Sequence, residues 1–168
     1  METIPRSKSS TALAIAAASL MIFATMTSAQ GTANVPAVSI APSATAATKT
    51  ITIWRDPGCG CCDAYAEYLE AKGYQVTRID DPDFDKRSVA VGVPAQGLGC
   101  HLAEIDGYYV GGLVPAEIIE RLVTERPEIT GITLPGMPSN APGMAAEKSG
   151  TLKTYAFGEA GVAVYSNE

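Results

Sequence analysis

Alternating apolar and polar positions mark two short strands around a helix near the start of the folded region. Residues 50–54 and 74–79 alternate β-branched or aromatic side chains with polar ones, a pattern typical of strands. Between them, apolar residues recur at helical spacing over 63–72, and Gly73 ends the pattern. Asp63 lies at the start of this helix, where a negative charge is favoured by the helix dipole. The pattern therefore predicts one βαβ unit.

The remaining pattern predicts a second helix, a hairpin, a third helix and a terminal hairpin. Asp106-Gly107 separates two apolar runs and is a strong two-residue turn signal. Pro115 opens an apolar helical stripe that Pro127 ends. The order β-α-β-α-β-β-α is that of a thioredoxin-like α/β domain, a mixed sheet flanked by helices, here with a C-terminal loop and β-hairpin extension. The expected segments are helix 83–91, loop 92–99, strands 101–105 and 108–110, the helix between the two prolines, loop 134–144, and strands 151–157 and 161–165 turning at Gly158-Glu159.

The first 29 residues have the pattern of a secretory signal peptide. Arg6 and Lys8 precede an uncharged, mostly apolar run over 11–29, which ends in the small residues Thr27-Ser28-Ala29. We expect cleavage after Ala29 and export to the periplasm. The alternative is a retained membrane anchor. It is disfavoured because a spanning helix needs about 20 strongly apolar residues, whereas this run is padded with Ala, Ser and Thr.

The rest of the chain divides into a linker and one domain. Residues 30–48 carry no charge and are almost all small or β-branched, which predicts a flexible linker with no large side chain to bury. Residues 49–168 are expected to form one thioredoxin-like metal-binding domain, because about 120 residues suffice for a single core. The formal charge of −6, with no basic cluster, disfavours nucleic acid as a partner. After signal cleavage we expect no membrane association.

Four cysteines carry the candidate chemistry, and three of them lie within four residues. Cys59 and Cys62 have C-x-x-C spacing at a helix start, where unpaired N–H groups and the helix dipole stabilise thiolate. As a catalytic redox pair, Cys59 would be the attacking thiol and Cys62 the resolving one. Cys61 adds a third sulfur between them. Cys100 and His101 should approach this cluster, because in a thioredoxin-like fold the loop before strand 101–105 faces that helix start.

Three or four sulfurs with an imidazole favour a soft metal ion, Cu(I) first and zinc second. His101 is the single histidine of the chain and directly follows Cys100. Met137 and Met144 lie in Gly/Pro-rich segments, and their thioethers are either Cu(I) ligands or packing residues beneath a loop. The candidate metal ligands are thus Cys59, Cys61, Cys62, Cys100, His101, Met137 and Met144.

Two alternatives to a metal site stay open. A thiol–disulfide oxidoreductase of the cell envelope would use Cys59 and Cys62 without metal. A disulfide-stapled interaction module would pair Cys59 with Cys62 and Cys61 with Cys100. The second alternative is disfavoured because a C-x-x-C bridge closes a very short loop, which gains little stability. Whether the protein is an enzyme, acting on thiols or on copper, therefore stays undecided at this stage.

Five motifs occur in a specific order along residues 50 to 165. They are Cys59-Gly60-Cys61-Cys62 after a Trp-bearing strand, Cys100-His101 before a strand, Asp106-Gly107-Tyr108, Gly112 through Val114-Pro115-Ala116, and the Pro-Gly-Met segments at 135–138 and 142–144. Together they resemble the CopG-like family of exported thioredoxin-like proteins associated with copper resistance.

The resemblance implies a copper-binding cysteine centre, holding a small cluster of Cu(I) ions, at positions 59, 61, 62, 100 and 101. It also implies other envelope copper-handling proteins as partners. Family members commonly carry His at the position of Leu113. If that His is a ligand elsewhere in the family, this chain has lost it, and its metal count or affinity then differs.

Overall fold

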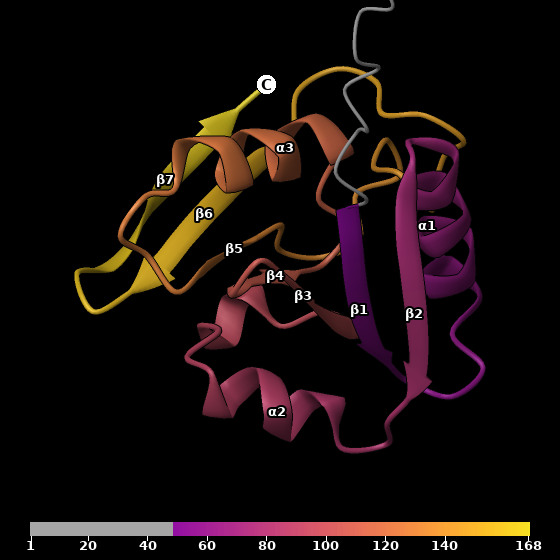
Figure 1. Cartoon of the computed structure of the whole chain (residues 1–168), viewed down its shortest axis with the longest axis horizontal. Coiled ribbons are helices and arrows are strands. Elements are labelled where there is room, and N and C mark those ends of the chain that lie inside the picture. Colours follow the sequence, from indigo (N-terminus) through magenta and orange to yellow (C-terminus); the bar gives the residue numbers. More distant parts are fainter. Residues whose placement is uncertain (1–48) are drawn as a thin grey trace, which may run out of the picture. The chain divides into compact units, whose positions relative to one another are not determined.

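The computed structural model describes residues 49–168 (Figure 1). The expected signal peptide (1–29) and linker (30–48) lie outside the described residues. The elements are β1 (Lys49–Arg55), α1 (Gly60–Ala71), β2 (Tyr74–Asp80), α2 (Phe84–Ala90), a 3-10 turn (Ala95–Gly97), β3 (His101–Ile105), β4 (Tyr108–Gly111), α3 (Ala116–Glu125), β5 (Gly131–Thr133), β6 (Lys153–Gly158) and β7 (Gly161–Asn167).

The described strands form one mixed sheet in the order β2-β1-β3-β4-β5-β6-β7. β1 pairs in parallel with β2, and β4 with β5. The other neighbouring pairs are antiparallel. These features confirm the expected mixed α/β architecture, and β5 joins the C-terminal hairpin to the same sheet (Figure 1).

The structure differs from the sequence pattern in three places. Helix α1 begins at Gly60 rather than Asp63, because the Cys62 and Asp63 amides already donate to the Cys59 carbonyl. The sequence pattern missed this start because Gly-Cys-Cys carries no apolar periodicity. The turn between β6 and β7 lies after Gly158, with Gly161 at a φ of +91°. β5 is short and was not predicted. A Cβ at Gly131 would lie 2.1 Å from the Tyr109 carbonyl oxygen, so only glycine lets this strand approach β4.

The apolar core lies mainly on one face of the sheet. Helices α1 and α3 bury Tyr65, Leu69, Ile119 and their neighbours against Ile51 and other β-branched strand residues, all in one cluster. A smaller cluster on the opposite face joins Val93, Leu102 and Phe157, with Val91 and Leu98 packed against it. Alternation along β1 and β3 sends successive side chains to these two faces.

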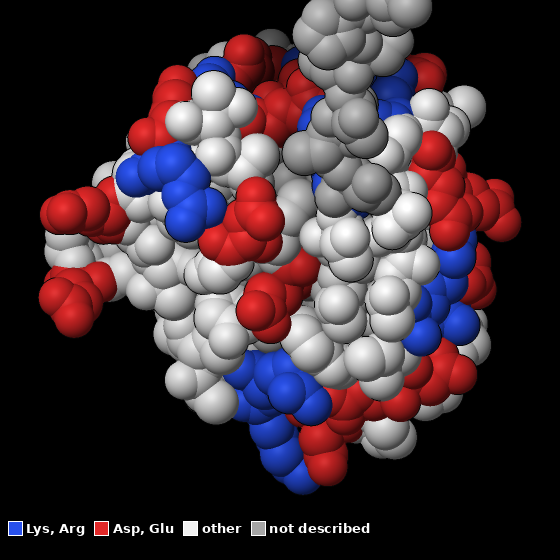
Figure 2. All heavy atoms as spheres, viewed as in Figure 1, with Lys and Arg blue, Asp and Glu red and all other residues white. Residues whose placement is uncertain are grey.

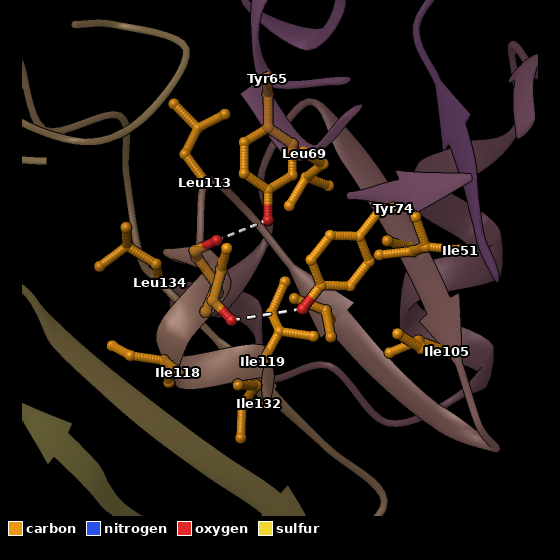
Figure 3. Packing of buried hydrophobic residues seen from close by; sticks show 14 of the residues in the cluster. Ile51, Tyr65, Leu69, Tyr74, Ile105, Leu113, Ile118, Ile119, Ile132 and Leu134 are labelled. Atoms are coloured by element: carbon orange, nitrogen blue, oxygen red, sulfur yellow. Dashed lines mark hydrogen bonds between the residues drawn. The ribbon is translucent and has the colours of Figure 1, made fainter. Parts of the chain in front are cut away.

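Three tyrosines tie α1 and β2 to the start of α3, and Figure 3 shows two of them, Tyr65 and Tyr74. The Tyr65 hydroxyl donates to the Val114 carbonyl at 2.6 Å, and Tyr74 donates to the Ala116 carbonyl at 3.3 Å. The Ala116 amide donates to the Tyr68 hydroxyl at 3.1 Å. Val114 and Tyr65 are fully buried. The hydrogen bond from the Tyr65 hydroxyl to the Val114 carbonyl therefore satisfies two polar groups that water cannot reach.

The described surface carries mixed charge. Arg78 pairs with Glu70 at 2.7 Å and Arg87 with Asp81 at 2.9 Å. On the face drawn in Figure 2, basic and acidic side chains lie interspersed between uncharged areas. Within residues 49–168, no helix combines the length and the apolar character required of a membrane span.

The Tyr65 hydrogen bond gives a test of how firmly α1 is held. Replacing Tyr65 by Phe leaves the buried Val114 carbonyl without its donor, so we expect the free energy of unfolding to fall by about 1–3 kcal/mol. Urea unfolding of the metal-free protein measures this change. The matched control is Tyr165→Phe, whose exposed bond to Glu125 is 3.5 Å long and should matter little. Equal losses of stability in the two variants would show that the buried Tyr65–Val114 hydrogen bond makes no special contribution to the fold.

Candidate metal centre

The turn between β1 and α1 places three cysteines at the helix start. The Cys59 amide donates to the Asp56 carbonyl at 3.1 Å, and Cys59 then caps α1. Cys61 and Cys62 follow in the first helical turn, where N–H groups without helical partners give a partial positive charge. Cys62 is fully buried, whereas Cys59 and Cys61 are half-buried. The turn therefore gathers three sulfurs at the helix start and leaves Cys59 and Cys61 partly accessible.

Cys100 reaches these sulfurs from the neighbouring strand. β3 runs antiparallel to β1 with His101 opposite Arg55, so the preceding residue lies beside the turn into α1. The Asp56 amide donates to the Cys100 carbonyl at 3.2 Å and fixes this juxtaposition. Burial, reinforced by the adjacent Cys61 sulfur, raises the pKa of the Cys100 thiol to about 12. The metal-free centre therefore holds Cys100 as a neutral thiol near pH 7.

The four sulfurs form a closed ring of contacts. Cys59 and Cys62 are joined by a disulfide, and Cys61 and Cys100 are free. The Cys61 Sγ lies 3.3 Å from the Cys59 Sγ and 3.4 Å from the Cys100 Sγ. The Cys100 Sγ lies 3.3 Å from the Cys62 Sγ. Because two thiols remain free, the alternative in which all four cysteines form disulfides does not describe this structure.

His101 lies beside the ring rather than within it. Its side chain is 1% exposed and stacks on Tyr65, with ring centroids 5.1 Å apart. Its Nδ1 is 4.0 Å from the Cys100 Sγ, and its Nε2 has no hydrogen-bond partner in the described part of the chain. Burial lowers the pKa of His101 to about 4, against an opposing backbone hydrogen bond at Gly112. The imidazole is therefore neutral at pH 7, but it faces the core.

The two candidate methionines lie in different places. The Met137 Sδ is 3.8 Å from the Cys61 Sγ, so this thioether borders the ring. Met144 lines a different hollow, with Ala64, Glu67 and Tyr68 of α1. Both side chains are exposed, by 53% for Met137 and 45% for Met144. The structure therefore brings Met137, and not Met144, to the cysteines.

The Gly/Pro/Met loop is held against the start of α1. Ala141 is fully buried, and a Cβ at Gly143 would lie 2.8 Å from the Cys61 carbonyl oxygen. Gly143 also has a φ of +88°, which disfavours other residues there. This close approach fixes the loop that carries Met137. The Pro-Gly-Met repeat was visible in the sequence, but its packing role was not.

Leu113 takes no part in the sulfur ring. It is fully buried in the main core, in the same cluster as Tyr65 (Figure 3). Sequence reasoning did not identify Tyr65 as the stacking partner of His101. The available signal was the spacing of three residues between Cys62 and Tyr65, which places both on one face of α1.

An apolar hollow of about 330 Å³ opens beside the ring. Cys100 and Met137 form part of its wall, so one free thiol and the thioether face a surface depression. The sequence pattern did not identify this feature, because its walls come from α2, the segment before β3 and the Met137 loop. The full lining is Phe84, Leu98, Gly99, Cys100, Gly136 and Met137.

The donor set fits a soft metal ion. One candidate ligand atom from each of the four cysteines lies within 4.8 Å of the others, and this group contains no carboxylate or imidazole. Thiolate–zinc bonds are about 2.3 Å long, so two sulfurs on one ion lie at most about 4.6 Å apart. Thiolate and thioether ligands select Cu(I), and thiolates also select zinc. The four cysteines are therefore a candidate site for a soft metal ion.

Two solved structures resemble this chain over about seven tenths of its length. A structure described as copper resistance protein CopG, form 2, is 33% identical over 72% of this chain and 98% of its own, with a TM-score of 0.65. Form 1 is 34% identical over 71% of this chain and 96% of its own, with a TM-score of 0.64. The chain belongs to the CopG family of copper resistance proteins.

The other comparisons add less. A family described as protein of unknown function, DUF411, matches residues 98–144, which run from the segment before Cys100 to Met144. No curated protein matches the chain. The resemblance to CopG-like proteins expected from the sequence motifs is thus confirmed by the two solved structures.

The buried histidine should make the metal-free protein less stable in acid. His101 binds a proton near pH 4 in the folded chain and near pH 6.5 when unfolded, so the unfolded state binds more protons between these values. Stability therefore falls as the pH drops through this range, by about 2 kcal/mol between pH 7 and pH 5. Urea unfolding at both pH values measures the loss.

The control for this prediction is His101→Phe, which keeps an aromatic ring against Tyr65 without titrating. Since His101 is the single histidine, the difference in pH dependence between the two proteins isolates its contribution from that of the carboxylates. The same pH dependence in both proteins would mean that the folded state does not depress the pKa of His101.

Proposed function

We propose that this protein binds Cu(I) through its cysteine ring in the bacterial periplasm and contributes to copper resistance, with thiol redox coupled to binding. The observation that carries the proposal is the contact ring of four cysteine sulfurs, with the Met137 thioether at its rim. Relatives described as copper resistance proteins support copper over zinc as the cargo. The N-terminal signal-peptide pattern supports export.

We also infer that the domain is thioredoxin-like. The support is the β1-α1-β2 unit with cysteines at the start of α1, followed by the β3-β4 hairpin and α3. In that interpretation, Cys100 and the Gly/Pro/Met loop add a thiol and a thioether to the cysteines of α1, and these further sulfurs suit the site to a metal ion. The partners would be copper ions and other envelope proteins that deliver or accept copper.

The start of α1 and the residues on the two sides of the sulfur ring have different roles in binding. When copper is bound, it replaces the thiol protons, so the N-terminal end of α1 offsets part of the charge of the thiolates. Half-buried Cys61 and Cys100 are the sulfurs nearest Met137 and the apolar hollow, the open side of the ring. Buried Cys62 and the stacked His101 close the inner side.

A thiol–disulfide oxidoreductase is the second candidate, and the Cys59–Cys62 disulfide favours it. Cys59 is half-buried and Cys62 fully buried, as an attacking and a resolving thiol should be. Against it, Cys61 and Cys100 each contact one sulfur of the pair and would compete in the exchange. An insulin-reduction assay on metal-free protein, with Cys59→Ser as its control, distinguishes this candidate from metal binding.

Anaerobic titration of the reduced protein with Cu(I) against a competing chelator tests the leading proposal. We expect at least one Cu(I) per chain, with all four thiols protected from alkylation at the endpoint. The double variant Cys61→Ser, Cys100→Ser should lose stoichiometric uptake, because it removes the two sulfurs that lie beside the Met137 thioether and the apolar hollow. Unchanged uptake by this variant, or tighter binding of zinc than of Cu(I) to the wild-type protein, would refute the copper site.

The methionines provide a matched pair of variants. Met137→Leu should weaken Cu(I) binding by about tenfold, as is common when a supporting contact of a metal site is removed. Met144→Leu should leave it unchanged, although its side chain is similarly exposed and lies in the same loop. The same chelator competition measures both. If Met144→Leu has the larger effect, the loop binds copper in another arrangement.

A further inference from the structure

The disulfide divides the sulfur ring into two pairs. It occupies Cys59 and Cys62, and the remaining two sulfurs are free thiols. The two thiols are neighbours, with their Sγ atoms 3.4 Å apart across the ring. The disulfide form therefore retains two adjacent soft donors at a site where the reduced form has four.

The surroundings of this thiol pair are also soft and apolar. The Met137 Sδ lies 3.8 Å from the Cys61 Sγ, and the apolar hollow reaches the Cys100 side. The two disulfide sulfurs bound the opposite side, each 3.3 Å from one free thiol. The candidate metal-ligating groups that converge here are cysteines, and within the described chain no carboxylate joins them.

We propose that the disulfide-bonded protein keeps a one-ion site, formed by Cys61 and Cys100, that takes Cu(I) and rejects zinc. This inference rests on the proposed copper-binding function and names the form of the protein in which part of that function persists. Reduction of the disulfide adds Cys59 and Cys62 and enlarges the site.

Selectivity follows from the number and kind of ligands. Protein zinc sites use three or four nitrogen, oxygen or thiolate ligands, and the disulfide form offers two thiolates. A thioether supports Cu(I) and not zinc. The buried imidazole stacks on Tyr65 and is not among the ligand atoms that group with the sulfurs. Cu(I) is satisfied by two or three soft ligands, which Cys61, Cys100 and Met137 supply. The reduced form, with four thiolates, suits both metals.

The redox step that links the two forms is a simple exchange. A small dithiol reduces the bridge: its two sulfurs form a cyclic disulfide, and its two protons pass to the Cys59 and Cys62 sulfurs as their bond breaks. Two electrons move from the dithiol to the protein, and Cys61 and Cys100 are unchanged. The state of one disulfide therefore sets how many sulfurs the centre offers to metal.

The experiment titrates the full protein in both forms under anaerobic conditions. The disulfide form is prepared without reductant and its Cys59–Cys62 bridge is verified by peptide mapping, while the reduced form is prepared with the dithiol and then desalted. Each is titrated with Cu(I) against bicinchoninate, and with zinc against a chromophoric zinc chelator. We expect one Cu(I) per chain in the disulfide form, protection of Cys61 and Cys100 from iodoacetamide, and at least tenfold weaker zinc binding than in the reduced form.

Two double variants separate the pairs. Cys59→Ser, Cys62→Ser retains only the proposed pair, so it should bind one Cu(I) and no zinc without any disulfide. Cys61→Ser, Cys100→Ser in its disulfide form should bind neither metal. Circular dichroism verifies that each variant is folded, and the wild-type disulfide form provides the same test without any substitution.

Failure of the inference can be told from failure of the proposed function. If the reduced protein binds Cu(I) but the disulfide form does not, the inference is overturned and the copper site stands. Equal zinc binding by both forms overturns the selectivity. A bridge that has moved to Cys62–Cys100 in the copper-loaded sample overturns the assignment of ligands. If neither form binds Cu(I), the proposed function and the inference both fail.

Discussion

The pairing of β1 with β3 is the constraint on which the centre depends. Its register places His101 opposite Arg55, and the Asp56 amide donates to the Cys100 carbonyl where β1 turns into α1. Successive side chains of a strand point to opposite faces, so only one of Cys100 and His101 can face the other cysteines. In the observed register the Cys100 side chain faces Cys61 and Cys62, and the His101 ring packs against Tyr65. A slip of one residue would exchange the two.

Charge is the main cost of bringing four cysteines together. Four thiolates in a half-buried site would repel one another and lose hydration. The structure limits this cost by forming one disulfide, by keeping Cys100 protonated through burial, and by placing the ring at the positive end of α1. A bound cation would neutralise the same charges. Disulfide formation and metal binding are therefore competing ways to stabilise the same four sulfurs.

Leu113 and the loop that carries Met137 are both held in place by packing. Leu113 is fully buried among apolar side chains, so it contributes to packing at a position where a histidine would be a buried polar group. The loop that carries Met137 is fixed by the buried Ala141 and by the close approach of Gly143 to Cys61. Packing thus fixes Leu113 in the core and the Met137 loop beside the cysteines.

The sequence by itself determined the elements and the chemistry. Period-two and helical patterns, the Asp106-Gly107 turn and the Pro115 start predict nearly all the helices and strands, because these signals are local. The clustering of Cys59, Cys61 and Cys62 at a helix start predicts a thiol site for the same reason. The short β5 escaped prediction, since its place depends on the contact of Gly131 with β4.

Tertiary structure alone decided which predicted residues meet. It put Met137 beside Cys61 and Met144 on another part of α1, although both lie in similar Pro-Gly-Met segments. It also stacked the His101 ring on Tyr65 and left Cys61 and Cys100 as the free pair. These outcomes depend on strand register and loop packing between segments far apart in the chain. Local sequence patterns do not determine which distant segments come into contact.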